Sequence, residues 1–164
     1  MHETIYFAAG CFWGVQYYFD QVPGVIATEV GYAGGYGENP TWEDVYSHRT
    51  GHAETLKVEF DPKVVSVETL VRQFFYMHDP TQTDGQGPDI GDSYRSEIFV
   101  LNDGQREIAQ KVLDELNEST YDGKIFTKIT PFTTWWTAED FHQKFSIRTG
   151  RGMCHKPYKA MAQA

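Results

Sequence analysis

The sequence is short of cysteine and of positive charge, and each shortage excludes a class of protein. Only two of its 164 residues are cysteines, Cys11 and Cys154, too few for a small secreted fold held together by disulfides. The 14 Lys and Arg are outnumbered by 23 Asp and Glu, so the formal net charge is -9. Without a basic cluster, the protein would repel the phosphates of nucleic acid. We therefore expect no nucleic-acid partner, whereas two cysteines are enough for a catalytic pair.

Long apolar runs and a basic N-terminal segment are also missing. No stretch approaches the ~20 residues that a membrane-spanning helix requires. Met1 to Thr4 lead directly into a predicted strand, unlike a secretory signal peptide. We expect a monomer in the reducing cytoplasm that binds no membrane. A chain of this length buries about 68–70% of its unfolded surface, so one core in a single domain over residues 1–164 is expected.

The sequence is organised around the segment Gly10-Cys11-Phe12-Trp13-Gly14. The apolar run Ile5 to Ala9 predicts a buried strand before it, and residues 15–19 predict the first turns of a helix after it. Cys11 is therefore expected at a strand-to-helix junction, where backbone N–H groups and the helix dipole favour negative charge and make a thiol a better nucleophile. The alternative is a small buried apolar residue. The flanking glycines and the two large aromatic residues favour the reactive role.

Periodicity and capping residues predict the remaining elements. Strands are expected at residues 25–32, 54–60, 97–101 and 125–129. Helices are expected from the caps Ser66 and Asn102 to about residues 77 and 117, and at 138–145. Glycine-rich loops separate them at 33–53 and 78–96, and loops of this length are usually functional. From residue 146 onwards we expect a flexible, irregular tail.

The order of the predicted elements indicates a fold class. The first six follow the order strand, helix, strand, strand, helix, strand, which is typical of a ferredoxin-like, split βαβ core. We expect an α+β fold built as a two-layer sandwich, with one helix layer on a mixed sheet, long functional loops and an irregular C-terminal tail. The fold class by itself indicates no function.

Four blocks of the sequence together resemble one family. They are Gly10 to Gly14; Val30 to Gly35 with Asn39-Pro40-Thr41; Arg49 to Glu54 with Phe60-Asp61-Pro62; and His78 to Thr81 through Gln86 to Ser96. With these four blocks in this order, the sequence is similar to the peptide methionine sulfoxide reductases of the A type over about residues 5–145. The resemblance implies a single catalytic domain that reduces methionine-S-sulfoxide, free or in proteins, as a repair activity against oxidative stress. It implies no metal or other cofactor.

Reduction of a sulfoxide sets two chemical requirements. Methionine sulfoxide carries a polar S=O group on an apolar chain, so a thiolate has to attack the sulfur and an acid has to protonate the departing oxygen. The resemblance implies that Cys11 is the nucleophile and Glu54 the acid. We expect Glu54 to point into aromatic surroundings, which would raise its pKa and keep it protonated near neutrality. The alternative is an exposed strand carboxylate.

Other side chains in the four blocks match the family's substrate-contacting residues. The resemblance implies that Phe12 and Trp13 hold the S-methyl group and that the Tyr94 hydroxyl donates a hydrogen bond to the sulfoxide oxygen. It also implies that Asp89 orients the substrate through an amide N–H. Core packing is the alternative for the two aromatic residues, and an ordinary turn is the alternative for Asp89.

Trp42 departs from the family pattern, which usually has a second tyrosine of the substrate pocket at this position. An indole N–H donates one hydrogen bond but cannot accept one or release a proton. We expect Trp42 to contribute to substrate binding with a weaker or differently shaped stabilisation of the oxygen. His52, Asp92 and Arg95 lie in the same blocks, and we expect them to hold the loops by hydrogen bonds.

The second cysteine suits the second half of a catalytic cycle. Attack by Cys11 leaves a sulfenic acid, which another thiol can resolve to a disulfide. Cys154 lies in the glycine-containing segment Gly150 to His155, which resembles the family's Gly-Tyr-Cys tail with Met153 in place of the tyrosine. A mobile tail can bring two Cα atoms within the ~7 Å that a disulfide requires. The resemblance implies that Cys154 resolves Cys11 and that thioredoxin reduces the disulfide; the alternative is an external thiol.

Three other functions are compatible with a thiol at such a junction. A thioredoxin-like oxidoreductase would need a C-x-x-C pair, but Gly14 occupies the second cysteine position. A one-cysteine peroxidase would leave the long aromatic and glycine loops unexplained. A binding module for methionine-containing peptides would bind them regardless of oxidation state. No ligand pair has zinc-like spacing, so no metal site is expected.

Overall fold

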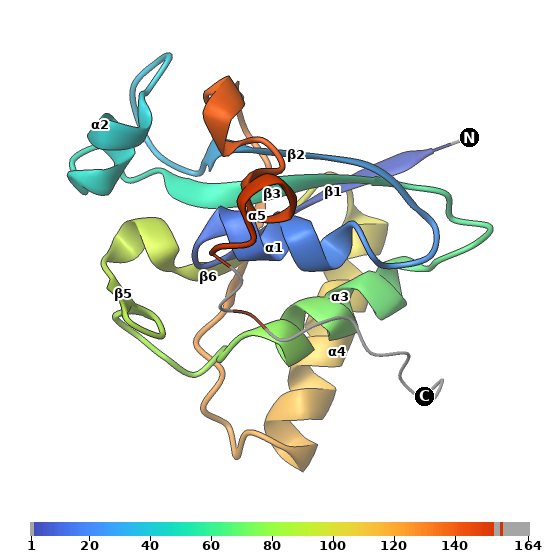
Figure 1. The fold of residues 1–164 in the computed structure, drawn as a ribbon. Helices are drawn as coiled ribbons and strands as arrows, with labels where there is room; N and C mark the ends of the chain where they lie inside the picture. The colour runs from blue at the N-terminus through green and yellow to red at the C-terminus, as the bar shows by residue number, and fades with distance from the viewer. Residues whose placement is uncertain (1, 153–154, 156–164) are drawn as a thin grey trace.

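Helices pack on one curled, six-stranded sheet in the computed structural model, which describes residues 2–152 and 155 (Figure 1). The spatial order is β7-β6-β1-β3-β2-β8, and the strands are β1 (Glu3–Ala9), β2 (Val25–Ala33), β3 (Ala53–Phe60), β6 (Ser96–Val100), β7 (Lys128–Pro131) and β8 (Trp135–Thr137). A separate hairpin consists of β4 (Gly85–Gln86) and β5 (Asp89–Ile90). The helices are α1 (Phe12–Phe19), α2 (Trp42–Tyr46), α3 (Val67–Met77), α4 (Asp103–Ser119) and α5 (Phe145–Thr149), with 3-10 turns η1 (Asp92–Tyr94) and η2 (Asp140–His142). The expected α+β class is confirmed.

The strand that leads to Cys11 lies in the middle of the sheet. β1 is antiparallel to β3 on one side and to β6 on the other, so Phe7 is opposite both Leu56 and Ile98. β3 lies between β1 and β2, the two strands that α1 connects. β7 is parallel to β6, and α4 belongs to the crossover connection that a parallel pair requires.

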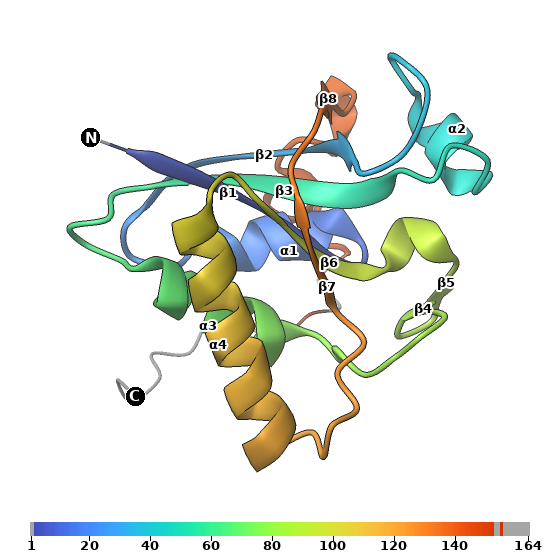
Figure 2. The same ribbon diagram turned by 180° about the vertical axis from the view of Figure 1, so that it is seen from behind.

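The main hydrophobic core lies between the sheet and the helices. α1 contacts β1, β2 and β3, while α4 contacts β6, β7 and α3 on the same face of the sheet (Figures 1 and 2). Alternate residues of β1 and β3 are fully buried there: Ile5, Phe7, Leu56 and Val58. The opposite face is covered by a second cluster, in which Tyr6 stacks on Phe132 with ring centroids 4.1 Å apart. β1 is therefore buried on both faces, as its continuous apolar run predicted.

Two helix starts follow the sequence prediction. The Ser66 hydroxyl accepts a backbone hydrogen bond of 3.1 Å at the start of α3, and Asn102 Oδ1 accepts one of 2.9 Å from Gln105 N at the start of α4. The Gln105 side chain does not return to the Asn102 amide as a capping box would. Its Oε1 instead accepts a hydrogen bond of 2.9 Å from Leu101 N, the amide of the residue before the N-cap.

The loop expected over residues 33–53 contains a helix that sequence analysis missed. Thr41 Oγ1 accepts a hydrogen bond from Asp44 N at 3.2 Å, and Asp44 Oδ2 accepts one from Thr41 N at 2.9 Å. This reciprocal capping box starts α2, and the Thr41-x-x-Asp44 spacing was the available signal. The loop expected over 78–96 similarly contains β4, β5 and η1.

The last expected strand begins three residues late. Ile125 N donates to Asn117 Oδ1 at 2.9 Å, and Phe126 N donates to Pro80 O at 2.7 Å. Because these amides bond to other segments, strand pairing begins only at β7, with Lys128. The expectation of a strand over 125–129 was therefore wrong at its start, and β8 was not expected.

The helix expected over residues 138–145 is also different. Lys144 has a φ of 56°, in the left-handed region, which interrupts helical geometry between η2 and α5. α5 extends to Thr149, so the first residues of the tail expected to be irregular from 146 are helical.

Three segments project together beyond the sheet at the end where β1 passes into α1. These are α2, the β4–β5 hairpin and η1, all on one side of the molecule in both views (Figures 1 and 2). The long loops of the sequence therefore gather at the end of the sheet where α1 begins.

Candidate active site

Cys11 is the N-cap residue of α1 and is separated from the end of β1 only by Gly10, so it lies at the strand-to-helix junction that the sequence predicted. Gly10 before it has a φ of 92°, a left-handed conformation that turns the chain sharply from strand into helix. The thiol side chain is partly exposed. A residue at this point lies beside the first N–H groups of the helix, where negative charge is favoured. The location therefore suits a reactive thiolate.

The Glu54 carboxyl is buried beneath the start of α1. Glu54 is 2% exposed and lies opposite Tyr32 in the β2–β3 pairing. Its Oε1 accepts a hydrogen bond from Phe12 N at 3.1 Å, and its Oε2 accepts one from Trp42 Nε1 at 3.2 Å. The alternative of an exposed strand carboxylate is wrong. Because Phe12 follows Cys11 directly, the acid and the thiol belong to one local site.

Burial controls the protonation of Glu54. Removal from water raises the pKa of Glu54 to about 8, and the negative charge of Asp89 adds to this effect. The hydrogen bonds from Phe12 and Trp42 stabilise the carboxylate and oppose the shift. The expected rise in pKa is confirmed. A carboxyl of this kind keeps its proton at neutral pH and can donate it.

Glu139 connects Trp42 to the sheet. Glu139 Oε2 accepts from Trp42 N at 3.0 Å, and its Oε1 accepts from the Tyr32 hydroxyl at 2.9 Å. Burial opposes ionisation of Glu139, but the hydrogen bonds it accepts lower its pKa overall, so it is a carboxylate. Trp42 is thus held by its backbone at Glu139 and by its indole at Glu54. Its single indole donor is used on the acid.

His142 joins the two aromatic residues after Cys11, and sequence analysis missed it. Trp13 Nε1 donates to His142 Nδ1 at 2.9 Å, and the Phe12 ring centroid is 5.2 Å from the imidazole. Trp13 also stacks on Phe145 with centroids 3.8 Å apart. His142 is 1% exposed, and within the described part of the chain its Nε2 has no hydrogen-bond partner. A histidine among aromatic residues was the only local signal, because the contact spans 129 positions.

Tyr94 and Asp89 come from the projecting loops to the same site. Tyr94 ends η1 and is 7% exposed. Burial raises the pKa of Tyr94, and the negative charges of Glu54, Asp89 and Cys11 raise it further, so these groups are its electrostatic neighbours. Asp89 begins β5, and partial burial raises its pKa as well. The Tyr94 hydroxyl therefore remains a proton-bearing donor near Cys11.

Hydrogen bonds tie down the loops around the site, as expected for His52 and Arg95. Gly35 N donates to His52 Nδ1 at 3.1 Å, and His52 Nε2 lies 3.2 Å from Gly37 O. Arg95 donates to Glu97 at 2.7 Å and to Asp92 O at 2.9 Å. These contacts give the loop residues a structural role.

Cys154 lies outside the described residues, so its expected pairing with Cys11 stays a prediction. Within residues 2–152 and 155, no three His, Cys, Asp or Glu side chains are grouped so that they could hold a metal ion.

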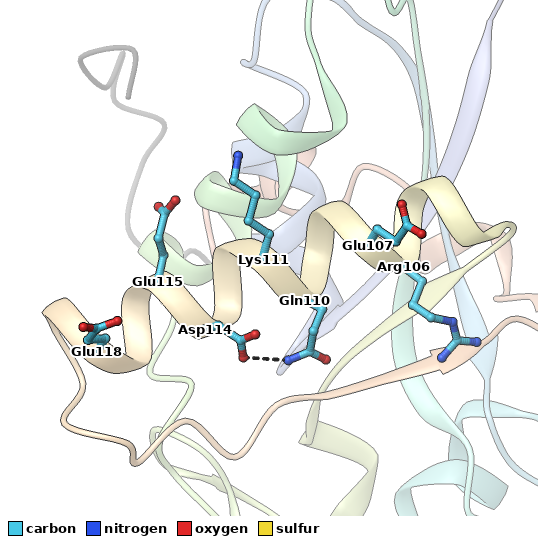
Figure 3. Close-up of a pocket in the computed structure, with 7 residues that line it drawn as sticks. All are labelled: Arg106, Glu107, Gln110, Lys111, Asp114, Glu115 and Glu118. Atoms are coloured by element: carbon cyan, nitrogen blue, oxygen red, sulfur yellow. Dashed lines mark hydrogen bonds between the residues drawn. The ribbon is translucent and has the colours of Figure 1, made fainter.

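A surface hollow of about 650 Å³ lies elsewhere, along the outer side of α4 (Figure 3). Its lining comes entirely from that helix: Arg106, Glu107, Gln110, Lys111, Asp114, Glu115 and Glu118. Gln110 donates to Asp114 at 2.8 Å, and Glu115 pairs with Arg72 at 2.6 Å. These charges are those of a solvated helix face.

None of the described helices is long and apolar enough to cross a membrane.

Comparison with known proteins agrees with this geometry. Residues 3–164 match the family model described as peptide methionine sulfoxide reductase. The enzyme named MsrA from Methanosarcina acetivorans is 47% identical over 149 residues, which cover 90% of this chain and 79% of that protein. The structure of reduced Mxr1 from Saccharomyces cerevisiae has a TM-score of 0.87 and 31% identity, over 92% of this chain and 87% of that one. Mxr1 in complex with Trx2 has a TM-score of 0.63 and 27% identity, over 88% and 84%. The chain therefore belongs to the peptide methionine sulfoxide reductase family and is an oxidoreductase that acts on peptide methionine sulfoxide.

Proposed function

We propose that this enzyme reduces methionine-S-sulfoxide, in proteins and as the free amino acid, with Cys11 as nucleophile and Glu54 as acid. One observation carries the proposal: the almost completely buried carboxyl of Glu54, with its pKa raised to about 8, accepts a hydrogen bond from the residue that follows Cys11. A nucleophile and a protonated acid side by side are what sulfoxide reduction requires.

The first half-reaction transfers the oxygen from the sulfoxide sulfur to the sulfur of Cys11. The Cys11 thiolate attacks the sulfoxide sulfur to form an S–S bond, and the Glu54 proton is transferred to the oxygen. The protonated oxygen then passes from the substrate sulfur to the Cys11 sulfur, and the S–S bond breaks with its electron pair left on the substrate sulfur. Cys11 ends as a sulfenic acid and the substrate as a thioether, so the enzyme thiol is oxidised and the sulfoxide sulfur is reduced. A neutral Glu54 avoids repulsion of the thiolate before the transfer.

The surrounding side chains have assigned roles in this proposal. Phe12 and Trp13 hold the S-methyl group, and the aromatic contacts with His142 support that role. Tyr94 donates to the sulfoxide oxygen, which its buried, proton-bearing hydroxyl supports. Asp89 accepts from a substrate amide. Trp42 contributes to the site through its indole hydrogen bond to Glu54 rather than as a donor to the oxygen.

The second half-reaction restores the thiol. Cys154 attacks the sulfenic acid of Cys11, a disulfide forms, and water leaves. Thioredoxin then reduces the disulfide. Support comes from Mxr1, which is similar in structure to this chain and is described in complex with Trx2.

The remaining proposals concern the whole molecule. We propose one catalytic domain over residues 1–164, with 146–164 as its tail, active as a monomer in the cytoplasm. In the chain, α1 links β1 to β2, and in the sheet β3 lies between these two strands; α3 and β6 then follow. This arrangement supports a ferredoxin-like, split βαβ core with two layers.

A sulfoxide assay with separated epimers tests the proposed function. Wild type should convert the S-epimer and leave the R-epimer unchanged, and Cys11→Ser should convert neither. Mass mapping after one turnover should find the oxidation on Cys11 and Cys154. Faster consumption of the thiol by peroxide than by methionine sulfoxide would instead identify a peroxidase.

A further inference from the structure

The C-terminal segment is seated on the loop that carries Cys11. His155 is 8% exposed, and its Nε2 lies 2.6 Å from Ala9 O at the end of β1. The carbonyl can only accept, so Nε2 carries the proton and donates it. Burial lowers the pKa of His155, which keeps the imidazole neutral in this contact. The contact joins residues 146 positions apart.

The two glycines that flank Cys11 make room for this histidine. A Cβ atom at Gly14 would lie 2.4 Å from His155 Nδ1 and 2.9 Å from Gly152 O. A Cβ atom at Gly10 would lie 3.4 Å from His155 Nε2. Glycine is a poor residue inside a helix, and Gly14 lies in α1 without a left-handed φ. The space taken by the tail therefore explains Gly14 better than its backbone conformation does.

A second contact places the same segment on Trp13. A Cβ atom at Gly152 would lie 2.9 Å from Trp13 Cε3, so the chain passes directly over this indole. Arg151 lies above the Phe145 ring, 5.6 Å from its centroid. The described residues Gly152 and His155 therefore both contact the start of α1, at Trp13 and at Gly14.

We propose that His155 is a positioning residue for the resolving step: by docking between Gly10 and Gly14 it keeps Cys154 within reach of Cys11. The proposal rests on the proposed role of Cys154. Neighbouring Cα atoms are ~3.8 Å apart, so anchoring residue 155 confines the cysteine before it. Confinement raises the effective concentration of the attacking thiol. In the step itself the Cys154 sulfur forms a bond to the Cys11 sulfur, the S–O bond of the sulfenic acid breaks, and the oxygen leaves as water with the thiol proton.

The test separates the two half-reactions in His155→Ala. One equivalent of enzyme is mixed with methionine sulfoxide without reductant, and samples are quenched with an alkylating agent. Methionine formed reports the Cys11 step, and the mass of the peptides reports the Cys11–Cys154 disulfide. We expect methionine formation within about twofold of wild type and disulfide formation slower by roughly tenfold or more, because the tail loses its restraint. Tryptic cleavage after Arg151 should become faster.

Two matched variants distinguish positioning from general structure. His155→Gln keeps an N–H donor near the position of Nε2 and should recover much of the disulfide rate, while His2→Ala removes an exposed histidine and should change neither step. Gly14→Ala should slow disulfide formation in wild type and have little further effect in His155→Ala.

Three results would overturn the proposal. One is an unchanged disulfide rate in His155→Ala. Another is an equal loss of both steps that His155→Gln does not recover. The third is the absence of a Cys11–Cys154 disulfide in the wild type, which would disprove the proposed role of Cys154 itself. The wild-type measurement alone therefore distinguishes a failure of the Cys154 role from a failure of the His155 role.

Discussion

Glu54 accepts a hydrogen bond of 3.1 Å from the backbone N–H of Phe12, the first residue of α1. This contact joins β3 to the helix that begins beside the thiol. The same carboxyl is almost completely buried and has its pKa raised to about 8. The site therefore combines a helix N-terminus, which favours a thiolate, with an acid that keeps its proton.

Removing the acid should impair the first half-reaction far more than removing the indole donor. Glu54→Ala should lower the single-turnover rate by about 10²- to 10⁴-fold, the usual range for a positioned acid. Trp42→Phe removes one hydrogen bond and should lower the rate by roughly tenfold or less. Glu59→Ala, on the same strand but partly exposed, is the control. Comparable losses in the two site variants would contradict the assignment of the acid.

The activity should fall at alkaline pH as Glu54 loses its proton. Single-turnover rates measured between pH 6 and 10 should decline above a pKa near 8. The Trp42 indole stabilises the carboxylate and lowers this pKa, so Trp42→Phe should move the decline to higher pH. A decline that stays unchanged in Trp42→Phe would show that another group controls it.

The same burial predicts a stability that depends on pH. The pKa of Glu54 is raised from 4.5 to about 8, so the folded state holds a proton that the unfolded state releases in this range. The contribution of protonated Glu54 to the free energy of unfolding is on the order of a few kcal/mol. This contribution is fully present below pH 4.5 and is lost as the pH rises through about 8. Glu54→Gln cannot ionise, so its free energy of unfolding should fall less between pH 5 and 9. Urea titrations of wild type and Glu54→Gln measure the difference, and parallel curves would refute it.

Cys154→Ser should separate the two halves of the cycle. The variant should still form one equivalent of methionine at the wild-type rate, because Cys11 and Glu54 are unchanged. With thioredoxin as reductant it should then stall, since no disulfide can form. Turnover at the wild-type rate with thioredoxin would assign resolution to an external thiol.

His142→Ala should weaken substrate binding. It removes the acceptor of the Trp13 indole N–H, and an unpaired donor of this kind costs about 1–3 kcal/mol when buried. We expect KM to rise by about tenfold with a smaller change in kcat, because Trp13 loses its fixed orientation. Steady-state kinetics with a methionine sulfoxide peptide measure both values. A fall in kcat alone would indicate that His142 takes part in the chemistry.

The sequence alone determined what depends on neighbours along the chain. A continuous apolar run located β1, hydrophobic patterns located β2, β3 and β6, and the polar caps Ser66 and Asn102 located α3 and α4, because these signals act within a few residues. Gly10 and the apolar run before it were enough to place Cys11 at a strand-to-helix junction. The family blocks singled out Glu54, although periodicity alone favoured an exposed side chain.

Only the tertiary structure decided how the site is assembled. The protonation of Glu54 depends on burial and on donors 42 and 12 positions away, at Phe12 and Trp42. His142 reaches Trp13 across 129 positions, and His155 reaches Ala9 across 146. Desolvation and hydrogen bonding between segments so far apart depend on which surfaces pack together, and a local pattern of residues carries no information about that packing.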